Sequence, residues 1–152
     1  MGRLVCCLLL LLVADAKGDE LFVAHSRDNP SVLWHHGLDA TLEETQRDGR
    51  VSIFKLHKRR GTEGAEGRFF ICTVLSLAKQ RGYVNYSIAE LIAGRIVVIF
   101  LKEHDEDIQA IIDSGYREYE FGERAGAEDI AMIEEMCAAA AKQDLTGAEH
   151  RD

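Results

Sequence analysis

The chain has 152 residues and a formal net charge of −8 at pH 7, with 26 aspartates and glutamates against 18 lysines and arginines. Its length fits one domain, large enough to bury about two-thirds of the surface that the unfolded chain exposes. Nucleic acids and anionic membranes both bind basic surfaces, so the acidic balance argues against either as the main partner.

The N-terminus has the pattern of a secretory signal peptide. Arg3 precedes an unbroken apolar run over 4–13, which ends at the small-x-small triplet "ADA" at 14–16. An apolar helix of this length covers about 15 Å, half of the roughly 30 Å that a bilayer core requires. We therefore predict a signal peptide over 1–16, cleaved after Ala16, and a secreted or periplasmic mature chain with no integral membrane span. A buried N-terminal helix and a retained anchor are the alternatives.

The next segment, 17–48, is predicted to be an N-terminal extension whose structure the sequence leaves open. Its first part, "ELFVAHSRDNP", could supply an edge strand before a turn at Asp28-Asn29-Pro30. Its last part, "DATLEETQRDG", could form a short helix capped by Asp39 or Thr41.

Two similar segments organise the middle of the chain, "GRVSIFKLHK" at 49–58 and "GRIVVIFLKE" at 94–103. Each begins with Gly-Arg, continues with β-branched and aromatic residues typical of strands, and is followed by a helical pattern and a Gly-Tyr. Two strand–helix–strand units in tandem predict an α+β fold of the ferredoxin-like split βαβ type (βαββαβ). Alternatively, the similarity is a coincidence, in which each Gly-Arg marks an ordinary turn and each Gly-Tyr an ordinary helix end. The expected strands are 51–57, 83–91, 95–102 and 116–121, and the expected helices are 66–81 and 105–114.

The strand expected at 95–102 is apolar on both faces, so both faces of the sheet need cover. We expect the helices at 66–81 and 105–114 to cover one face. The other is left for an additional C-terminal helix, for the N-terminal segment, or for a second copy in a homodimer through the open sheet face. The C-terminal helix carries Ile130, Ile133 and Cys137 on one stripe. The α+β domain is thus predicted over 49–142, followed by a polar tail at 143–152.

The four cysteines are Cys6 and Cys7 in the apolar run, and Cys72 and Cys137 in the predicted domain. The first two lie near the start of the run, whereas a lipoprotein carries its lipidated cysteine at the end of such a run. For the second pair, one disulfide is arithmetically possible in an exported chain. If their helices cover opposite faces of the sheet, however, their Cα atoms lie beyond the roughly 7 Å limit for a bridge. We therefore predict two buried free thiols.

The strongest candidate for a metal site is "WHHGLD", which offers His35, His36 and Asp39. Imidazole and carboxylate groups bind zinc or copper. No HExxH or similarly spaced set is present, and a solvent-facing loop with scattered histidines is the alternative.

Three further motifs have simpler structural interpretations. The glycine-containing "KRRGTEGAEGR" at 58–68 could bind phosphate, but its spacing is that of neither dinucleotide nor P-loop motifs and its glutamates would repel an anion. The acidic "HDED" at 104–107 is better explained by a helix cap at His104 or Asp105 than by an acid–base or cation site. Asn85 begins a glycosylation sequon within a predicted strand.

The segments "RVSI", "LSLAKQRGYVNYSI" and "EDIQAII" together resemble small bacterial envelope lipoproteins of unknown function, over about residues 50–112. This resemblance implies an envelope location and transfers no catalytic residues. We predict a non-catalytic secreted or periplasmic binding or interaction module whose partner is a protein or a small ligand. The alternative is a metal-binding protein or metal-dependent enzyme that uses His35, His36 and Asp39.

Overall fold

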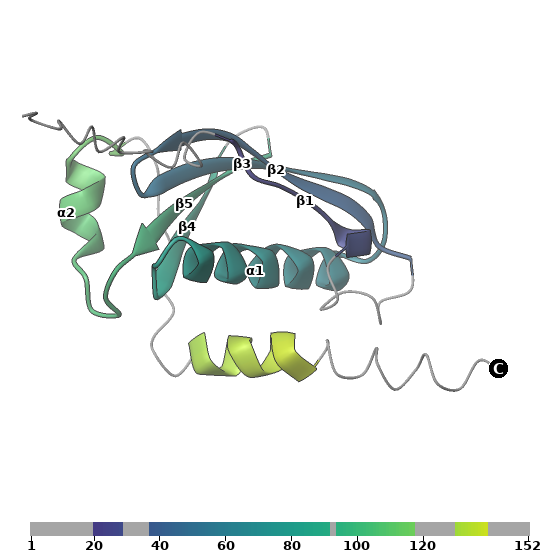
Figure 1. Ribbon diagram of the computed structural model, residues 1–152. Helices are drawn as coiled ribbons and strands as arrows, with labels where there is room; N and C mark the ends of the chain where they lie inside the picture. The colour runs from purple at the N-terminus through teal and green to yellow at the C-terminus, as the bar shows by residue number, and fades with distance from the viewer. Residues whose placement is uncertain (1–19, 29–36, 92–93, 118–129, 140–152) are drawn as a thin grey trace, which may run out of the picture.

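The computed structural model describes residues 20–28, 37–91, 94–117 and 130–139. The predicted signal peptide, the polar tail, His35 and His36 lie outside these residues. The described residues form an α+β structure in which one antiparallel sheet is packed against helices (Figure 1). The predicted α+β class is therefore confirmed. Among the described residues, no helix is both long and apolar enough to cross a membrane.

The sheet has five strands in the order β1-β2-β3-β5-β4, and every neighbouring pair is antiparallel. Because β3 and β4 are both antiparallel to β5, they run parallel to each other, and α1 connects them. This is one split βαβ unit. The complete ferredoxin-like topology is not confirmed, since β2 lies beside β3 where that fold would place its last strand. The strands are β1 (Val23–His25), β2 (Asp39–Asp48), β3 (Val51–Arg60), β4 (Asn85–Leu91) and β5 (Arg95–Leu101).

The prediction of a short helix in "DATLEETQRDG" is wrong, because this segment forms β2. Its residues alternate in burial: Ala40, Leu42 and Glu44 are buried toward α1, whereas Glu43 is exposed. This period of two belongs to a strand with one covered face. The turn into β3 contains Gly49 with φ +55°, a left-handed conformation that glycine adopts without steric cost.

The long helix α1 (Glu63–Gln80) covers one face of the sheet. It begins three residues before the predicted start because the side chain of Thr62 accepts a hydrogen bond of 3.2 Å from the backbone N–H of Ala65. It ends at Gln80 with Arg81 as its C-cap, and Gly82 follows with φ +79°. The core between α1 and the sheet contains Leu42, Phe54, Phe69, Val74, Val98 and Phe100.

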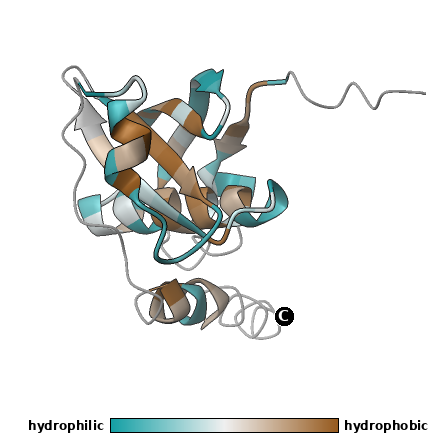
Figure 2. Ribbon diagram, turned by 90° about the vertical axis from the view of Figure 1, so that its left-hand side faces the viewer, coloured by the Kyte–Doolittle hydropathy of each residue, from teal (hydrophilic) through white to brown (hydrophobic). Residues whose placement is uncertain are grey.

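The short helix α2 (Ile108–Asp113) lies on the opposite face, where Ile108, Ile111 and Ile112 pack against the apolar part of the sheet. The prediction that both faces of the strand at 95–102 are covered is confirmed. The prediction that the two helices share a face is wrong. Figure 2 shows the apolar segments gathered in the middle of the molecule, where the strands meet the helices. The residues of the sheet that pack in this second core are Val51, Ile53, Ala89, Val97, Ile99 and Leu101.

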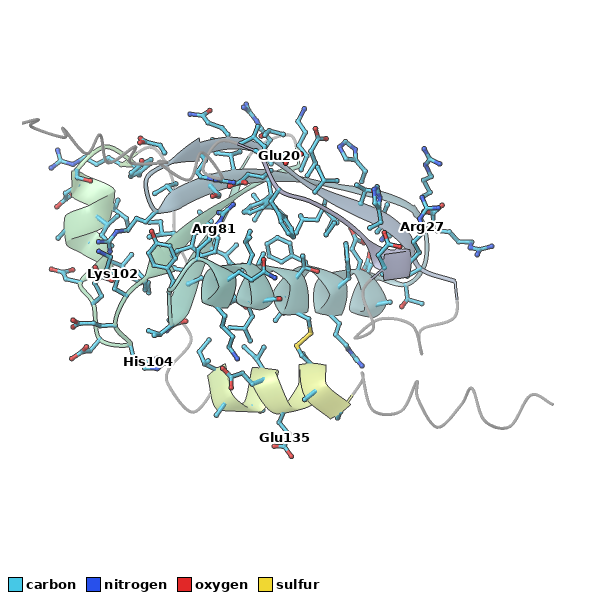
Figure 3. All side chains as sticks on the ribbon, viewed as in Figure 1. Glu20, Arg27, Arg81, Lys102, His104 and Glu135 are labelled. Carbon is cyan, nitrogen blue, oxygen red and sulfur yellow. A yellow bond between two sulfur atoms is a disulfide. The ribbon has the colours of Figure 1, made fainter. Side chains whose placement is uncertain are left out.

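A C-terminal helix over 130–139 packs on α1 rather than on the sheet (Figures 1 and 3). A disulfide joins Cys72 of α1 to Cys137 of this helix, with 5.8 Å between their Cα atoms. The predicted pair of free thiols is therefore wrong. Its premise failed because α2 already covers the far side of the sheet, and because α1 has apolar residues on its outer side that a further helix can cover. Ile130, only 4% exposed, belongs to the α1 core.

Candidate functional site

The half of the sheet that α2 leaves uncovered carries positively charged side chains. Along β3, Val51 and Ile53 pack toward α2, and the next residues on the same face are Lys55 and His57. In the strand register, Lys55 lies between Glu43 of β2 and Arg95 of β5. We call this surface the cationic face; it comprises His25, Arg27, Lys55, His57, Arg59 and Arg95, with the carboxylates of Asp39 and Glu43.

Two histidines of the cationic face flank one threonine across three adjacent strands. His25 of β1 and His57 of β3 are both the register partners of Thr41 in β2. The Nδ1 atom of His25 lies 3.0 Å from Oγ1 of Thr41, and Nε2 of His57 lies 3.6 Å from a carboxylate oxygen of Glu43. A cavity of about 270 Å³ lies beside these two histidines. It is lined by His25, Arg27, Asp39, Thr41, His57 and Arg59.

The charge of the cationic face is opposite to that of the whole chain. Four lysine and arginine side chains face two carboxylates there, whereas the chain has a net charge of −8. Lys55 and Arg95 are direct cross-strand partners, and like charges in this position destabilise a sheet. Figure 3 shows long side chains projecting from the side of the sheet opposite α1, with Arg27 at one end. Glu43, the partner of Lys55 on the other side, offsets part of this repulsion.

Of the three residues predicted to bind metal, only Asp39 is described. It lies at the start of β2 and lines the cavity of the cationic face with His25 and His57. In the described parts of the chain, no group of three or more histidine, cysteine, aspartate or glutamate side chains has an arrangement that could hold a metal ion. Sequence reasoning did not bring His25 and His57 together, because they are far apart in sequence. They lie on one face because both are register partners of Thr41, and the sequence does not reveal this pairing.

A second charged cluster surrounds Glu44, whose side chain is fully buried. Its carboxylate receives two hydrogen bonds from Arg47, at 2.6 and 3.0 Å, and one of 2.8 Å from Arg81. The hydroxyl of Ser52 and the backbone N–H of Phe22 also donate to it. The cluster therefore joins β2, β3, the end of α1 and the segment that leads into β1.

These hydrogen bonds determine the ionisation of Glu44. Burial alone would raise the pKa of this carboxyl group, because it disfavours the charged form. Hydrogen bonds from Arg47, Arg81, Ser52 and the backbone of Phe22 outweigh that effect and lower the pKa to about 2. Glu44 is thus a carboxylate at every physiological pH, and its charge holds the two guanidinium groups in place.

The acidic residues at 104–107 have structural roles. Asp107, rather than the predicted His104 or Asp105, caps α2 and accepts hydrogen bonds from the backbone N–H groups of Gln109 and Ala110. Glu106 pairs with Arg50, and it accepts a hydrogen bond of 2.8 Å from the backbone N–H of Lys102. Burial favours the neutral form of Glu106, but these hydrogen bonds lower its pKa overall.

The segment at 58–68 and the sequon at Asn85 also contribute to the fold rather than to a binding site. Lys58 pairs with Glu66, so a glutamate neutralises one cation of the glycine-containing connector before α1. Asn85 has no exposed surface and its Oδ1 accepts a hydrogen bond from the backbone N–H of Tyr86. The folded protein therefore presents no accessible acceptor at this sequon.

Comparisons with protein-family models, with curated proteins and with solved structures found no match.

Proposed function

We propose that this protein is an exported, non-catalytic binding module that docks an acidic protein partner on its cationic face. The observation that carries the proposal is the concentration of Arg27, Lys55, Arg59 and Arg95 on the half of the sheet that α2 does not cover, in an acidic chain. Complementary charge on facing surfaces steers association and selects partners.

Two features support export. The N-terminal 16 residues have the pattern of a signal peptide. The Cys72–Cys137 disulfide is of the kind that forms and persists in oxidising compartments such as the periplasm and the extracellular space.

The shape of the cationic face favours a protein over a small ligand. Its cavity of about 270 Å³ is at the lower limit of ligand pockets, which typically enclose roughly 300–1,000 Å³. The charged side chains are spread over neighbouring strands and are exposed, with 58% of the His57 side chain accessible. Exposed charged side chains spread over several strands suit the polar contacts of a protein interface.

The same charge disfavours a homodimer through this face. In a twofold-symmetric dimer, the same patch of both copies meets across the axis. Lys55, Arg59 and Arg95 would then approach their own copies, and like charges in contact oppose association.

The proposal is tested with a fluorescently labelled glutamate- and aspartate-rich peptide, whose binding is followed by anisotropy. We expect saturable binding that weakens as salt rises from 50 to about 300 mM, because screening shortens the reach of exposed charges. The variant Lys55→Glu with Arg59→Glu should abolish it. The matched control Lys102→Glu reverses an exposed cation near α2 and should bind as the wild type does.

Two competing probes separate the proposal from other anionic partners. A DNA duplex and vesicles containing phosphatidylglycerol are titrated under the same conditions. The proposal is wrong if the acidic peptide does not bind and the DNA or the vesicles do bind, with an affinity that Lys55→Glu lowers. If Lys102→Glu weakens peptide binding as much as the double variant does, the attraction is not specific to the cationic face.

The alternative function is that of a metal-binding protein or metal-dependent enzyme with zinc or copper at His35, His36 and Asp39. Of its three ligands, the structure describes Asp39, which lines the cavity of the cationic face. Metal analysis of protein purified without a histidine tag tests it. Stoichiometric zinc or copper that is lost in His35→Ala with His36→Ala would support this alternative over the binding module.

A further inference from the structure

A hollow of about 990 Å³ lies where the segment before β1, the β2–β3 turn and the end of α1 come together. Its charged lining residues are Glu20, Arg47 and Arg81, none of which belongs to the cationic face. The hollow combines apolar walls with two guanidinium groups. The residues that matter are Leu21, Val23, Leu77 and Tyr83 for the walls, and Arg47 and Arg81 for the charge.

Arg81 retains hydrogen-bonding capacity toward the hollow. A guanidinium group has five N–H donors. One terminal nitrogen of Arg81 donates to the hydroxyl of Ser52 at 3.1 Å, and the other donates to Glu44 at 2.8 Å. The group also lies 5.3 Å from the centre of the Phe100 ring, which fixes its plane. With 18% of its side chain exposed, Arg81 can still donate to a ligand.

The negative charge of Glu44 does not face the hollow. Its side chain is fully buried behind Arg47 and Arg81, so the hollow meets guanidinium N–H groups rather than a carboxylate. Glu20 lines the hollow and is exposed, and its backbone carbonyl accepts a hydrogen bond of 3.0 Å from Arg47. An anion that enters the hollow therefore meets a preorganised cation.

The rim of the hollow exposes apolar side chains that the fold does not use. Leu21 is 42% exposed and Val23 is 52% exposed, and both line the hollow. Among the described residues, only Val84 and Met132 are comparably exposed large hydrophobic side chains. Exposed apolar groups around a concave polar site are typical of binding sites for amphiphilic ligands.

We infer that this hollow binds a carboxylate carried on an apolar body. The guanidinium of Arg81 holds the carboxylate, and Leu21, Val23, Leu77 and Tyr83 cover the apolar part. A fatty acid and a peptide that ends in an apolar residue with a free C-terminus share this chemistry. The inference is independent of the acidic partner proposed for the cationic face, because the two surfaces have no charged residue in common.

Calorimetric titration with two matched pairs of probes tests the inference. The first pair is octanoate and octanamide, and the second is the tripeptide Ala-Leu-Leu with a free or an amidated C-terminus. We expect at least one carboxylate to bind about tenfold more tightly than its own amide, as charge-assisted hydrogen bonds to arginine require. A preference for octanoate over octanamide would identify the ligand as a fatty acid. A preference for the free tripeptide over the amidated one would identify it as a peptide C-terminus. If neither carboxylate binds, or if the amides bind equally well, the inference is wrong.

Variants of the rim locate the site without disturbing Glu44. Leu21→Ser with Val23→Ser should weaken the carboxylate probe at least about fivefold, because it removes apolar contact area. The matched control Met132→Ser changes an exposed apolar residue on the helix at 130–139 and should leave affinity unchanged. Glu20→Gln should bind at least as tightly as the wild type. Unchanged affinity in the double serine variant would place any binding elsewhere and overturn the inference.

Discussion

Arg81, at the end of α1, donates a hydrogen bond of 2.8 Å to Glu44, which lies 37 residues earlier in the middle of β2. The contact is unusual because one partner is a fully buried carboxylate. Burying a charge is costly unless it is paired and hydrogen-bonded, and Glu44 meets both conditions through Arg47, Arg81 and Ser52. This cluster fixes where the helix ends relative to the strands, and with it the position of Arg81 in the hollow.

The first prediction concerns the loss of this charge. Glu44→Gln keeps the shape of the side chain but removes the negative charge that pairs with Arg47 and Arg81 in a partly buried site. We expect a loss of about 3–5 kcal/mol in the free energy of unfolding, measured by urea denaturation. Glu43→Gln, at the exposed neighbouring position, is the control and should change stability by less than about 0.5 kcal/mol. Equal effects of the two variants would contradict the structural role of Glu44.

The second prediction concerns pH. The pKa of Glu44 is about 2 in the folded protein, against an ordinary value of 4.5. Because the folded pKa is the lower one, the stabilisation is fully present above pH 4.5 and is lost as pH falls toward 2. The shift corresponds to roughly 3 kcal/mol. Urea denaturation of the wild type and of Glu44→Gln from pH 6 to pH 2.5 should show the gap in stability narrowing, and a constant gap would refute the assignment.

The third prediction concerns the disulfide. We expect no free thiol in the denatured mature protein without reductant, because Cys72 and Cys137 are bonded. Cys137→Ser should remove roughly 2–4 kcal/mol of stability, since the bridge closes a long loop between α1 and the C-terminal helix. Thiol titration and thermal unfolding measure the two effects. A count of two thiols would mean that the helix at 130–139 is not tied to α1.

The fourth prediction concerns the two faces of β5. Val98 packs toward α1 and Ile99 packs toward α2, and both side chains have no exposed surface. Val98→Asp and Ile99→Asp should each cost several kcal/mol, on the order of 3–5, because each buries an unpaired charge. Val84→Asp, at a position that is 40% exposed, is the control. If Ile99→Asp were tolerated, α2 would not cover this face in solution.

The fifth prediction concerns export. Intact-mass measurement on protein recovered from the exported fraction should show a chain that begins at Lys17. A chain that still carries residues 4–13 would contradict the proposed signal peptide.

The local sequence was sufficient to predict β3, β4, β5 and α1, because the residues of each element favour its secondary structure. The runs at 51–57, 83–91 and 95–102 are rich in β-branched and aromatic residues and form β3, β4 and β5. The apolar residues before Arg81 form α1, with a glycine after its end. These signals are short-range, so they can be read without knowledge of the neighbours. The segment that forms β2 lacks them, because it is rich in polar residues that also suit a helix.

Only the tertiary structure decided which elements meet. Glu44 becomes a buried residue of a strand because Ser52 of β3 and Arg81 at the end of α1 reach it from other parts of the fold. His25 and His57 share a surface because both strands pair with Thr41. Strand register and the choice of which helix covers which face depend on contacts between residues distant in sequence. The cationic face and the hollow at Arg81 depend on the same contacts, so neither could be predicted from the order of residues alone.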